Sequence, residues 1–343
     1  MYSKFNVILI FFITILIGSC NKDSIYVHPQ IKLENSGVVN YNITASSNHL
    51  AFPDLIRYND KWFLTYREGD GHLYKDFSKI IVLISEDFVK WNKLQELEIS
   101  KLDLRDPKFS FNSSINKLYI HFHGIPQGTE LKNSRSYYCE FSDNDMEFDI
   151  IKMLRLPDNL PNKLWECDWL WKPLWYKSKF YVNGYLYNGI RTYSTNDLSK
   201  GVSLIGKSWN IGWSEAASII KEDTLITVVR TNGLAKWGKT SLKNIDYEWG
   251  NIPINDIGGP NLIHFNNNSY FIAGRQEGRF EIFNYDADNN NIISIFRSNS
   301  ISPDIGYNGM FLHNNKLYAV YYEELPDKSY VIKRVVLNLD GYE

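Results

Sequence analysis

The clearest pattern in this chain is a short alternation of apolar and polar residues. Runs of about five to eight residues, rich in Val, Ile, Tyr, Phe and Trp, follow one another and are separated by Asn, Asp and Gly. Beyond residue 20, no window keeps the 3.6-residue apolar period of an amphipathic helix over about a dozen residues. The pattern therefore predicts an all-β protein.

The alternating runs also repeat as a larger unit. An apolar strand, a polar turn and a second, aromatic-rich strand recur six times, at intervals of about 40 to 65 residues. Repeats of this period, with four short strands each, are typical of propeller blades. We predict a single six-bladed β-propeller domain over residues 41–343. The six segments begin at Pro53, Asp106, Lys172, Glu215, Gly259 and Tyr307.

The first residues have the pattern of an export signal. Lys4 precedes an apolar run over residues 5–17, which ends in Gly18, Ser19 and Cys20. The segment over residues 16–20 resembles a bacterial lipobox, and that resemblance implies acylation of Cys20. We expect a signal peptide over residues 1–19, a tether over 20–40, and a protein anchored to the bacterial cell envelope by lipid alone, facing the periplasm or the outside.

Composition limits the partners. Lys and Arg number 37 against 39 Asp and Glu, so there is no broad basic surface and we do not expect a nucleic acid partner. The remaining cysteines, Cys139 and Cys167, have no metal-site spacing, and we expect no metal and no cofactor. With 10 Trp, 23 Tyr and 19 Phe, the chain is rich in rings that suit stacking on sugars, which favours a glycan as the partner.

A second recurring element follows three of the hairpins. It begins at Ser85, Ser142 and Ser194, each followed closely by an aspartate. These segments resemble the Asp boxes of sialidase-type propellers, although the glycine of the box is missing. An aspartate at this position accepts hydrogen bonds from the backbone N–H groups of its own turn. We therefore interpret the boxes as structural and not as metal or catalytic sites.

The six hairpins, compared position by position, resemble those of the sialidase family over nearly the whole chain after residue 40. The resemblance implies a carboxylate and an arginine from blade four, a second arginine from blade five, and a tyrosine and an acid from blade six. It also implies an arginine at the end of blade one's second strand, followed by a loop that holds the acid/base. The matching residues are Glu215, Arg230, Arg275, Tyr307, Glu323 or Glu324, and Arg67.

Blade one departs from the family pattern. The family opens this blade with Arg-Ile-Pro, whose arginine clamps the substrate carboxylate, whereas this chain has Ala51, Phe52 and Pro53. A methyl group cannot replace a bidentate arginine, so sialic acid itself is not the expected substrate. The motifs at residues 67–72 (REGDGH) and 104–107 (LRDP) resemble those of divergent sialidase-family lipoproteins.

These residues allow hydrolysis of a terminal sugar, which can carry an acidic group, and leave a retaining or an inverting outcome open. A tyrosine has an ordinary pKa of about 10 and becomes a nucleophile when a carboxylate takes its proton, which the pair Tyr307 and Glu215 can provide. His72 or Asp70 would protonate the leaving oxygen. We expect the sugar to be held by four arginines and an aspartate: Arg67, Arg105, Arg230, Arg275 and Asp168. Stacking surface would come from Trp169, Trp171 and Trp175.

Two alternatives stay open at this stage. Five-bladed glycosidases with two aspartates and a glutamate resemble the set Asp54, Asp106 and Glu215, in which Asp54 would be base or nucleophile, Asp106 would orient the substrate and Glu215 would be the acid. The other alternative is a propeller that binds a glycan without cleaving it, because a fold does not determine a function.

Overall fold

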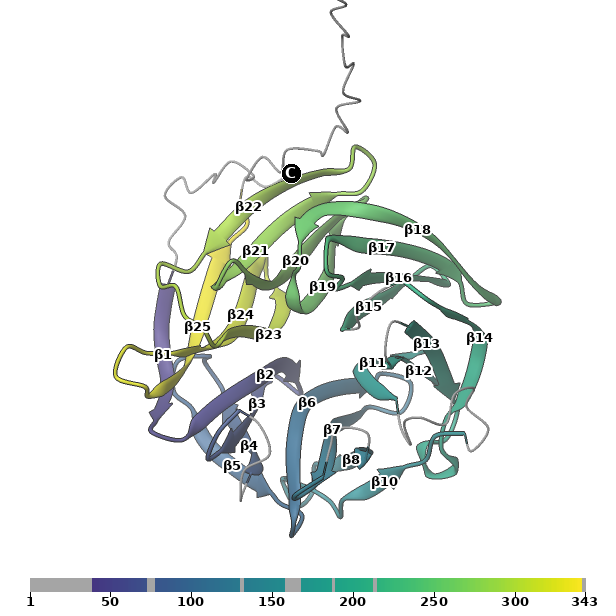
Figure 1. The fold of residues 1–343 in the computed structure, drawn as a ribbon. Coiled ribbons are helices and arrows are strands. Elements are labelled where there is room, and N and C mark those ends of the chain that lie inside the picture. Colours follow the sequence, from purple (N-terminus) through teal and green to yellow (C-terminus); the bar gives the residue numbers. More distant parts are fainter. Residues whose placement is uncertain are drawn as a thin grey trace, which may run out of the picture.

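Six antiparallel sheets surround a central axis and confirm the predicted all-β, six-bladed β-propeller (Figure 1). The computed structural model describes residues 39–72, 78–129, 133–157, 168–186, 189–211 and 215–340. The predicted signal peptide, Cys20, Cys167 and most of the predicted tether lie outside these residues. Within them, no helix is long and apolar enough to cross a membrane.

Each blade is a meander whose first strand lies nearest the axis and whose second strand lies beside it. The innermost strands are β2 (His49–Tyr58), β6 (Leu102–Asn112), β11 (Trp169–Tyr176), β15 (Ala216–Lys221), β19 (Gly258–Asn266) and β23 (Ile305–His313). The second strands are β3 (Lys61–Gly69), β7 (Lys117–Pro126), β12 (Lys179–Leu186), β16 (Thr224–Val229), β20 (Ser269–Gln276) and β24 (Lys316–Glu324).

The outer half of each blade contains shorter or more exposed strands. The third strands are β4 (Ser78–Ser85), β8 (Arg135–Ser142), β13 (Gly189–Thr195), β17 (Leu234–Ser241), β21 (Arg279–Asp286) and β25 (Tyr330–Asn338). The outermost are β5 (Asn92–Leu97), β10 (Lys152–Leu154), β14 (Ser203–Trp209), β18 (Asn244–Asn255), β22 (Asn291–Arg297) and β1 (Val39–Ser46). Blade two differs from the predicted four strands, because the short β9 (Glu147–Phe148) also pairs with β8.

The two ends of the described chain meet in one blade. Strand β1 pairs antiparallel with β25, from Val39 opposite Val336 to Ser46 opposite Tyr330, so the first strand completes the blade formed by the last three. The pairing covers the edge of β25 and closes the ring. Strand β1 therefore starts just before residue 41, where the sequence places the beginning of the domain.

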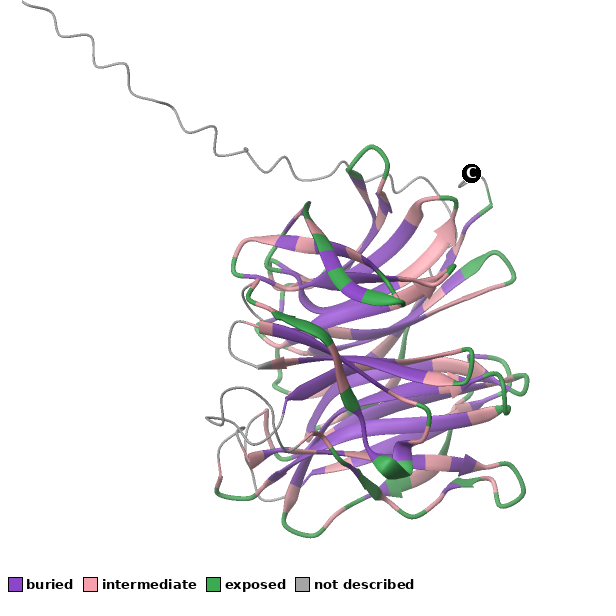
Figure 2. Ribbon diagram, turned by 90° about the vertical axis from the view of Figure 1, so that its right-hand side faces the viewer, coloured by how far each residue is buried: buried purple, intermediate pink, exposed green. Residues whose placement is uncertain are grey.

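The inner and second strands are buried on both faces, because a neighbouring blade covers each face. In β3 and β7 almost every residue is buried, and exposed residues gather in the turns at the ends of the strands (Figure 2). Apolar clusters lie between adjacent blades; Phe271 and Ala273 of β20, for example, pack with Met310 of β23. Because both faces are buried, the sequences of these strands are nearly continuous apolar runs and do not alternate strictly between apolar and polar residues.

Five of the six innermost strands contain a bulge at the same place. The register shifts there, and the residue at the bulge has a positive φ: Phe52, Asp106, Lys172, Gly259 and Tyr307. In the first four of these strands a proline follows, which the inner edge tolerates because it has no neighbouring strand to bond. Bulges redirect side chains, and residues in strained backbone regions gather at functional sites. The recurring bulge therefore marks the axial end where Asp106 and Tyr307 lie.

Two of the three Asp-box-like turns, those at Asp87 and Asp197, have the capping role that the sequence predicts. The Asp87 carboxylate accepts hydrogen bonds from the backbone N–H groups of Val89 and Lys90, at 2.8 Å each. These bonds lower the pKa of Asp87. Asp197 likewise accepts from the Ser199 N–H at 3.0 Å, at the start of a 3-10 turn, Leu198–Lys200.

The contact between the last and first inner strands gives a stability prediction. A Cβ atom on Gly309 of β23 would overlap the backbone of Asp54 and Leu55 in β2. Gly309→Ala should therefore lower the free energy of unfolding by about 1–3 kcal/mol. Gly250→Ala is the matched control, since a Cβ there meets nothing within 4 Å and the change should stay within about 0.5 kcal/mol. Urea unfolding of both variants tests the packing, and equal stability would contradict it.

Candidate functional site

A tyrosine and a glutamate from different blades meet near the axis. The Tyr307 hydroxyl of β23 donates to Glu215 Oε1 at 2.5 Å, and Glu215 precedes β15 in blade four. Glu215 Oε2 accepts from the backbone N–H of Gly259 at 2.6 Å and from Arg230 Nη1 at 3.3 Å. Only 5% of Glu215 is exposed, so these donors replace the water that the carboxylate has lost.

The surroundings keep the proton on the phenol. Burial raises the pKa of Tyr307 well above 10, and the negative charges of Glu215 and Asp106 raise it further. Burial alone would lower the pKa of Arg230, but the charges of Glu215 and Asp256 outweigh it and raise the pKa. The site therefore holds a neutral phenol against a carboxylate that can take its proton, beside a fixed positive charge.

Asp106 lies at the bulge of β6 in the same region. Its Oδ1 atom is buried and accepts no hydrogen bond from the described residues. Burial raises the pKa of Asp106, Arg105 and Lys108 oppose this effect, and Glu215 adds to it. Its side chain, together with Lys108, also lines a small cavity between blades two and three. Asp106 is thus a carboxyl group whose protonated form is favoured by its environment.

Lys108 is a buried cation that sequence reasoning did not identify. Its Nζ has no hydrogen-bond partner in the described part of the chain and lies over the Trp171 ring, 5.2 Å from the centroid. Burial lowers the pKa of Lys108, while the carboxylates of Asp54, Asp106 and Glu215 raise it. The lysine therefore lies among three acids that come from three different blades, which shows how closely the inner strands converge.

Aromatic rings surround the tyrosine. Phe52 of β2 packs edge-on against the Tyr307 ring at 4.9 Å, and Trp171 of β11 lies 5.7 Å from it on another side. Tyr185 of β12 and Tyr322 of β24 complete the lining, and burial together with nearby carboxylates raises the pKa of both. Neither tyrosine has a sequence signal that separates it from the other tyrosines of the chain.

Two arginines present donors at this site. Arg275 of β20 is half-buried, lies against the backbone of Gly258 and Gly306, and has no hydrogen bond or ion pair within the described residues. Arg105 of β6 donates to the His72 carbonyl at 2.9 Å and stacks over Phe52, and its Nε lies 4.0 Å from Asp103 Oδ2 without a hydrogen bond to a described residue. A guanidinium with unused donors suits a carboxylate or another anion.

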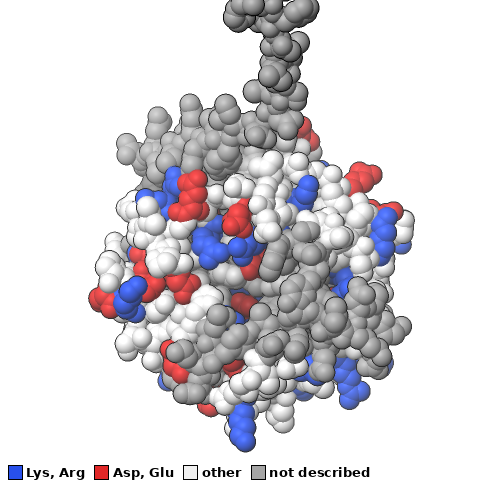
Figure 3. Space-filling view, in the orientation of Figure 1, with Lys and Arg blue, Asp and Glu red and all other residues white. Residues whose placement is uncertain are grey.

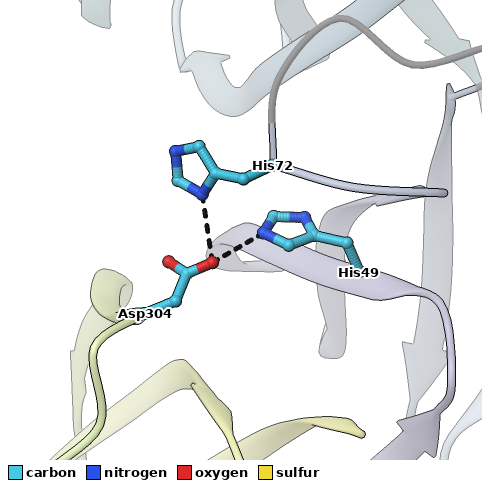
Figure 4. Close-up of side chains that lie close together, drawn as sticks. All are labelled: His49, His72 and Asp304. Atoms are coloured by element: carbon cyan, nitrogen blue, oxygen red, sulfur yellow. Dashed lines mark hydrogen bonds and ion pairs between the residues drawn. The ribbon is translucent and has the colours of Figure 1, made fainter. Parts of the chain in front are cut away.

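A second cluster lies beside Phe52 and contains His49, His72 and Asp304 (Figure 4). Their potential ligand atoms lie within 4.8 Å of one another, as in a metal site. However, Arg67 Nη1 lies 3.1 Å from His49 Nδ1 and can only donate, so neutral His49 must carry its proton on Nε2, toward Asp304. A metal ligand would need a lone pair there, so the arrangement is that of a hydrogen-bond network. Sequence reasoning missed His49 and Asp304, whose segments match no motif.

Arg67 and Asp54 do not have the roles predicted for them. Arg67 is 0% exposed and donates twice to Asp103, at 2.7 and 3.1 Å, so it holds two strands together and does not face a substrate. Asp54 is buried and accepts from the Phe109 N–H at 2.8 Å and from Lys172 Nζ at 3.0 Å. Both oxygens of Asp54 bond within the fold and only 1% of the residue is exposed, so Asp54 is not placed to meet a substrate or an attacking water.

The tryptophan-rich run is also part of the interior. Asp168 is buried and accepts from Arg191 at 2.7 Å and from the Tyr193 hydroxyl at 2.6 Å. Trp169 stacks on His123 at 4.1 Å, and Trp175 stacks on Tyr119 at 5.5 Å. Trp171 is buried beneath Tyr307. The rings of this run thus pack between blades, with Trp169 and Trp171 buried and Trp175 partly exposed.

The remaining predicted residues are placed as follows. Asp70 is exposed at the end of β3, two residues before His72. Ala51 is fully buried, where the family pattern has an arginine. Glu323 is bonded to Lys333 at 3.0 Å, and Glu324 to Lys328 at 3.0 Å, so neither joins the tyrosine. On the face seen in Figure 3, which has the orientation of Figure 1, acidic and basic side chains gather near the centre.

Comparison with known proteins supports the fold. No protein-family model matches this sequence, and no curated protein sequence is significantly similar to it. A protein of unknown function from Dyadobacter fermentans matches with a TM-score of 0.71 at 13% identity, over 88% of this chain and 99% of that one.

Two sialidases are also similar in structure. Trypanosoma rangeli sialidase, in a covalent intermediate with 2,3-difluorosialic acid, matches with a TM-score of 0.71 at 13% identity, over 90% of this chain and 60% of that one. NanB sialidase from Streptococcus pneumoniae matches with a TM-score of 0.69 at 10% identity, over 91% of this chain and 72% of that one. This chain thus spans less than two thirds of the trypanosomal enzyme, and the likeness extends to the propeller fold.

The different environments of two arginines can be tested by stability. Arg67→Met leaves the Asp103 carboxylate buried without its cation, and we expect a loss of about 3–5 kcal/mol in the free energy of unfolding. Arg275→Met removes a guanidinium that bonds to no described residue, and stability should change by less than about 0.5 kcal/mol. Urea denaturation of the two variants measures both. A large loss in the Arg275 variant would show that this arginine is structural.

Proposed function

We propose that this protein is a retaining, sialidase-like glycoside hydrolase that acts on a terminal sugar with an acidic group. The observation that carries the proposal is the hydrogen bond of 2.5 Å between the Tyr307 hydroxyl and Glu215, two residues brought together from blades six and four. A buried tyrosine bonded to a carboxylate is the arrangement that an aryl-oxide nucleophile requires. The propeller shared with two sialidases supports the same reaction class.

In the proposed reaction, Tyr307 attacks the anomeric carbon while its proton passes to Glu215. The glycosidic bond breaks, its electron pair goes to the leaving oxygen, and that oxygen receives a proton from an acid of the site. Water then releases the sugar from Tyr307, and Glu215 returns the proton to the phenolate. Arg230, fixed beside Glu215 at 3.3 Å, balances the charge of the carboxylate before the attack.

Arg275 is the proposed partner for the acidic group of the sugar. It is the guanidinium in this site without a bond to a described residue, and Asp106 is close enough to the tyrosine to hold a sugar hydroxyl. Because Ala51 stands at the place of one clamp arginine, the grip on a carboxylate is weaker than three arginines would give. We therefore propose that ordinary sialosides are poor substrates.

The alternative with two aspartates and a glutamate has less support. It needs Asp54 as base or nucleophile, but Asp54 bonds to Lys172 and to the Phe109 backbone, and the propeller has six blades where that family has five. A propeller that binds a glycan without cleaving it uses the same residues, and the hydrolysis test below separates it from an enzyme.

The test of catalysis is a panel of 4-methylumbelliferyl glycosides of sialic acid, other ulosonic acids, uronic acids and neutral sugars. We expect hydrolysis of an acidic sugar, with weak activity on sialosides. Glu215→Gln and Tyr307→Phe should each reduce kcat by about 10²- to 10⁴-fold, and the double variant should lose little more, because the two groups act as a unit. Tyr41→Phe, at an exposed tyrosine of β1, is the control.

Three other results would redirect the proposal. Full activity of Tyr307→Phe with loss in Asp54→Asn would favour the two-aspartate mechanism. Tight binding of glycans on an array, with no turnover of any panel member, would establish a binding protein. If the protein neither binds nor cleaves any glycan, both the hydrolase and the binding-protein proposals are contradicted.

We also propose that the protein is exported and held in the bacterial envelope by acylated Cys20. The apolar segment over residues 5–17 and the small residues before Cys20 support this. Cys20→Ala should move the protein from the membrane fraction to the soluble fraction of the cells that express it. If the variant stays with membranes after a carbonate wash, the lipid anchor at Cys20 is excluded.

A further inference from the structure

Asp304 is the centre of a hydrogen-bond network beside the catalytic pair. Its Oδ2 atom accepts from His49 Nε2 at 2.8 Å and from His72 Nδ1 at 3.0 Å, and its Oδ1 accepts from the Tyr322 hydroxyl at 2.5 Å (Figure 4). Burial alone would raise the pKa of Asp304, but the bonds from both histidines and the tyrosine outweigh it and lower the pKa. Asp304 thus stays ionised and keeps its direction toward His72.

Buried groups behind Asp304 hold the network in one arrangement. Arg67 Nη1 donates to His49 Nδ1 at 3.1 Å, while the Nε and Nη2 atoms of Arg67 donate to Asp103. Burial lowers the pKa of His49, so this ring stays neutral with its proton on Nε2. The chain of bonds from Asp103 through Arg67 and His49 therefore fixes the position of Asp304 Oδ2, which also accepts from His72.

His72 is the exposed end of this network. Its side chain is 41% exposed, and its second ring nitrogen points away from Asp304 (Figure 4). The His72 ring packs edge-on against Phe52 at 5.6 Å, and Phe52 in turn packs against Tyr307 at 4.9 Å. His72 and Tyr307 thus both contact the Phe52 ring, which places the two side chains in the same part of the site.

We propose that His72 is the proton donor and acceptor of this site, and that Asp304, His49 and Arg67 are positioning residues that hold its ring. The proposal rests on the function proposed above. In the first step, His72 Nε2–H gives its proton to the leaving oxygen as the C–O bond breaks and Tyr307 bonds to the anomeric carbon. In the second, neutral His72 takes a proton from water, whose oxygen displaces Tyr307 from that carbon.

Asp106 is the competing proton donor, and its placement favours another role. One of its oxygens is buried, and the side chain lines the interior cavity that Lys108 and His121 also line. No described residue fixes its direction by a hydrogen bond to Oδ1. His72, in contrast, combines a free nitrogen with an anion that orients the ring, which is the arrangement of a histidine that acts as acid and base.

The charged groups around His72 determine the sign of a pH test. Asp304 bonds its Nδ1, the neutral His49 ring lies 5.1 Å away, Arg105 bonds its carbonyl, and Asp106 is near enough for its charge to interact. The negative charge of Asp304 favours the protonated ring, and activity should fall where His72 loses its proton. Asp304→Asn should therefore move the high-pH limb of the kcat profile to lower pH.

The experiment measures kcat against pH for the wild type, Asp304→Asn and a surface control, Asp60→Asn, whose side chain is 91% exposed. His72→Gln should lose about 10²- to 10⁴-fold on alkyl glycosides, which need a proton on the leaving oxygen, and much less on 4-methylumbelliferyl glycosides. Azide should restore turnover of the activated substrate in this variant. Normal cleavage of alkyl glycosides by His72→Gln would overturn the proposal.

A second measurement needs no substrate. NMR of protein with ¹⁵N-labelled histidine should show a changed Nδ1 chemical shift for His72 in Asp304→Asn, because the carboxylate that accepts its hydrogen bond is lost, with His313 as the internal reference. Tyr322→Phe removes one donor from Asp304 and should also change the His72 Nδ1 shift, which keeps the test valid if Asp304→Asn does not fold.

The outcomes separate the two proposals. If the wild type cleaves glycosides but the high-pH limb does not move in Asp304→Asn, His72 is not the acid and the proposed function stands. If the wild type cleaves nothing on the panel, the proposed function fails and the role of His72 as proton donor fails with it. An unchanged His72 Nδ1 chemical shift in Asp304→Asn would contradict the network itself.

Discussion

Closure of the ring is the constraint on which the site depends. Tyr307 belongs to blade six, Glu215 to blade four, and the Gly259 N–H that bonds Glu215 belongs to the blade between them. A contact of 2.5 Å across three blades exists only if the inner strands keep their spacing. The pairing of β1 with β25 and the close approach of β23 to β2 fix that spacing where the ring closes. The contact between Tyr307 and Glu215 thus depends on the whole propeller and not on any one blade.

The interior near the axis is unusually rich in charge. Lys108 lies among Asp54, Asp106 and Glu215, Lys172 bonds Asp54, and Arg67 bonds Asp103. Buried charges cost desolvation energy and are tolerated when they are paired. Most of these charges are paired with one another, whereas Asp106, Arg275 and the second nitrogen of His72 keep bonding capacity that no described residue uses. Those three groups come from blades two, five and one.

The sequence predicted the fold because its signal is periodic. Six hairpins at a regular spacing, with turn residues between them, specify a propeller whatever their details. The pairing of Tyr307 with Glu215 was expected because both residues stand at positions that match the sialidase hairpins, at the starts of inner strands. The environment of a single side chain is a different matter. Arg67 and Arg275 both stand near the ends of second strands and look alike in sequence, yet one is fully buried against Asp103 and the other is free. Asp304 and His49 carried no motif, because their role depends on contacts between the first and last blades.

The aromatic residues show the same limit. The tryptophans of residues 168–175 suggested a sugar-stacking surface, but the spaces between blades need large rings, and these residues fill them. The bulges of the inner strands are the opposite case. Four of them carry a proline directly after the bulge residue, and this pattern is visible in the sequence once the strands are aligned. The recurring proline would have located the axial end of those four inner strands.

The most direct test of the central claim is identification of the nucleophile. The protein is incubated with a fluorinated glycosyl fluoride of the sugar that it hydrolyses, digested, and analysed by mass spectrometry. The account predicts a covalent sugar adduct on the peptide that contains Tyr307, and its absence in Tyr307→Phe. An adduct on an aspartate or glutamate, or turnover with inversion at the anomeric carbon and no adduct, would contradict it.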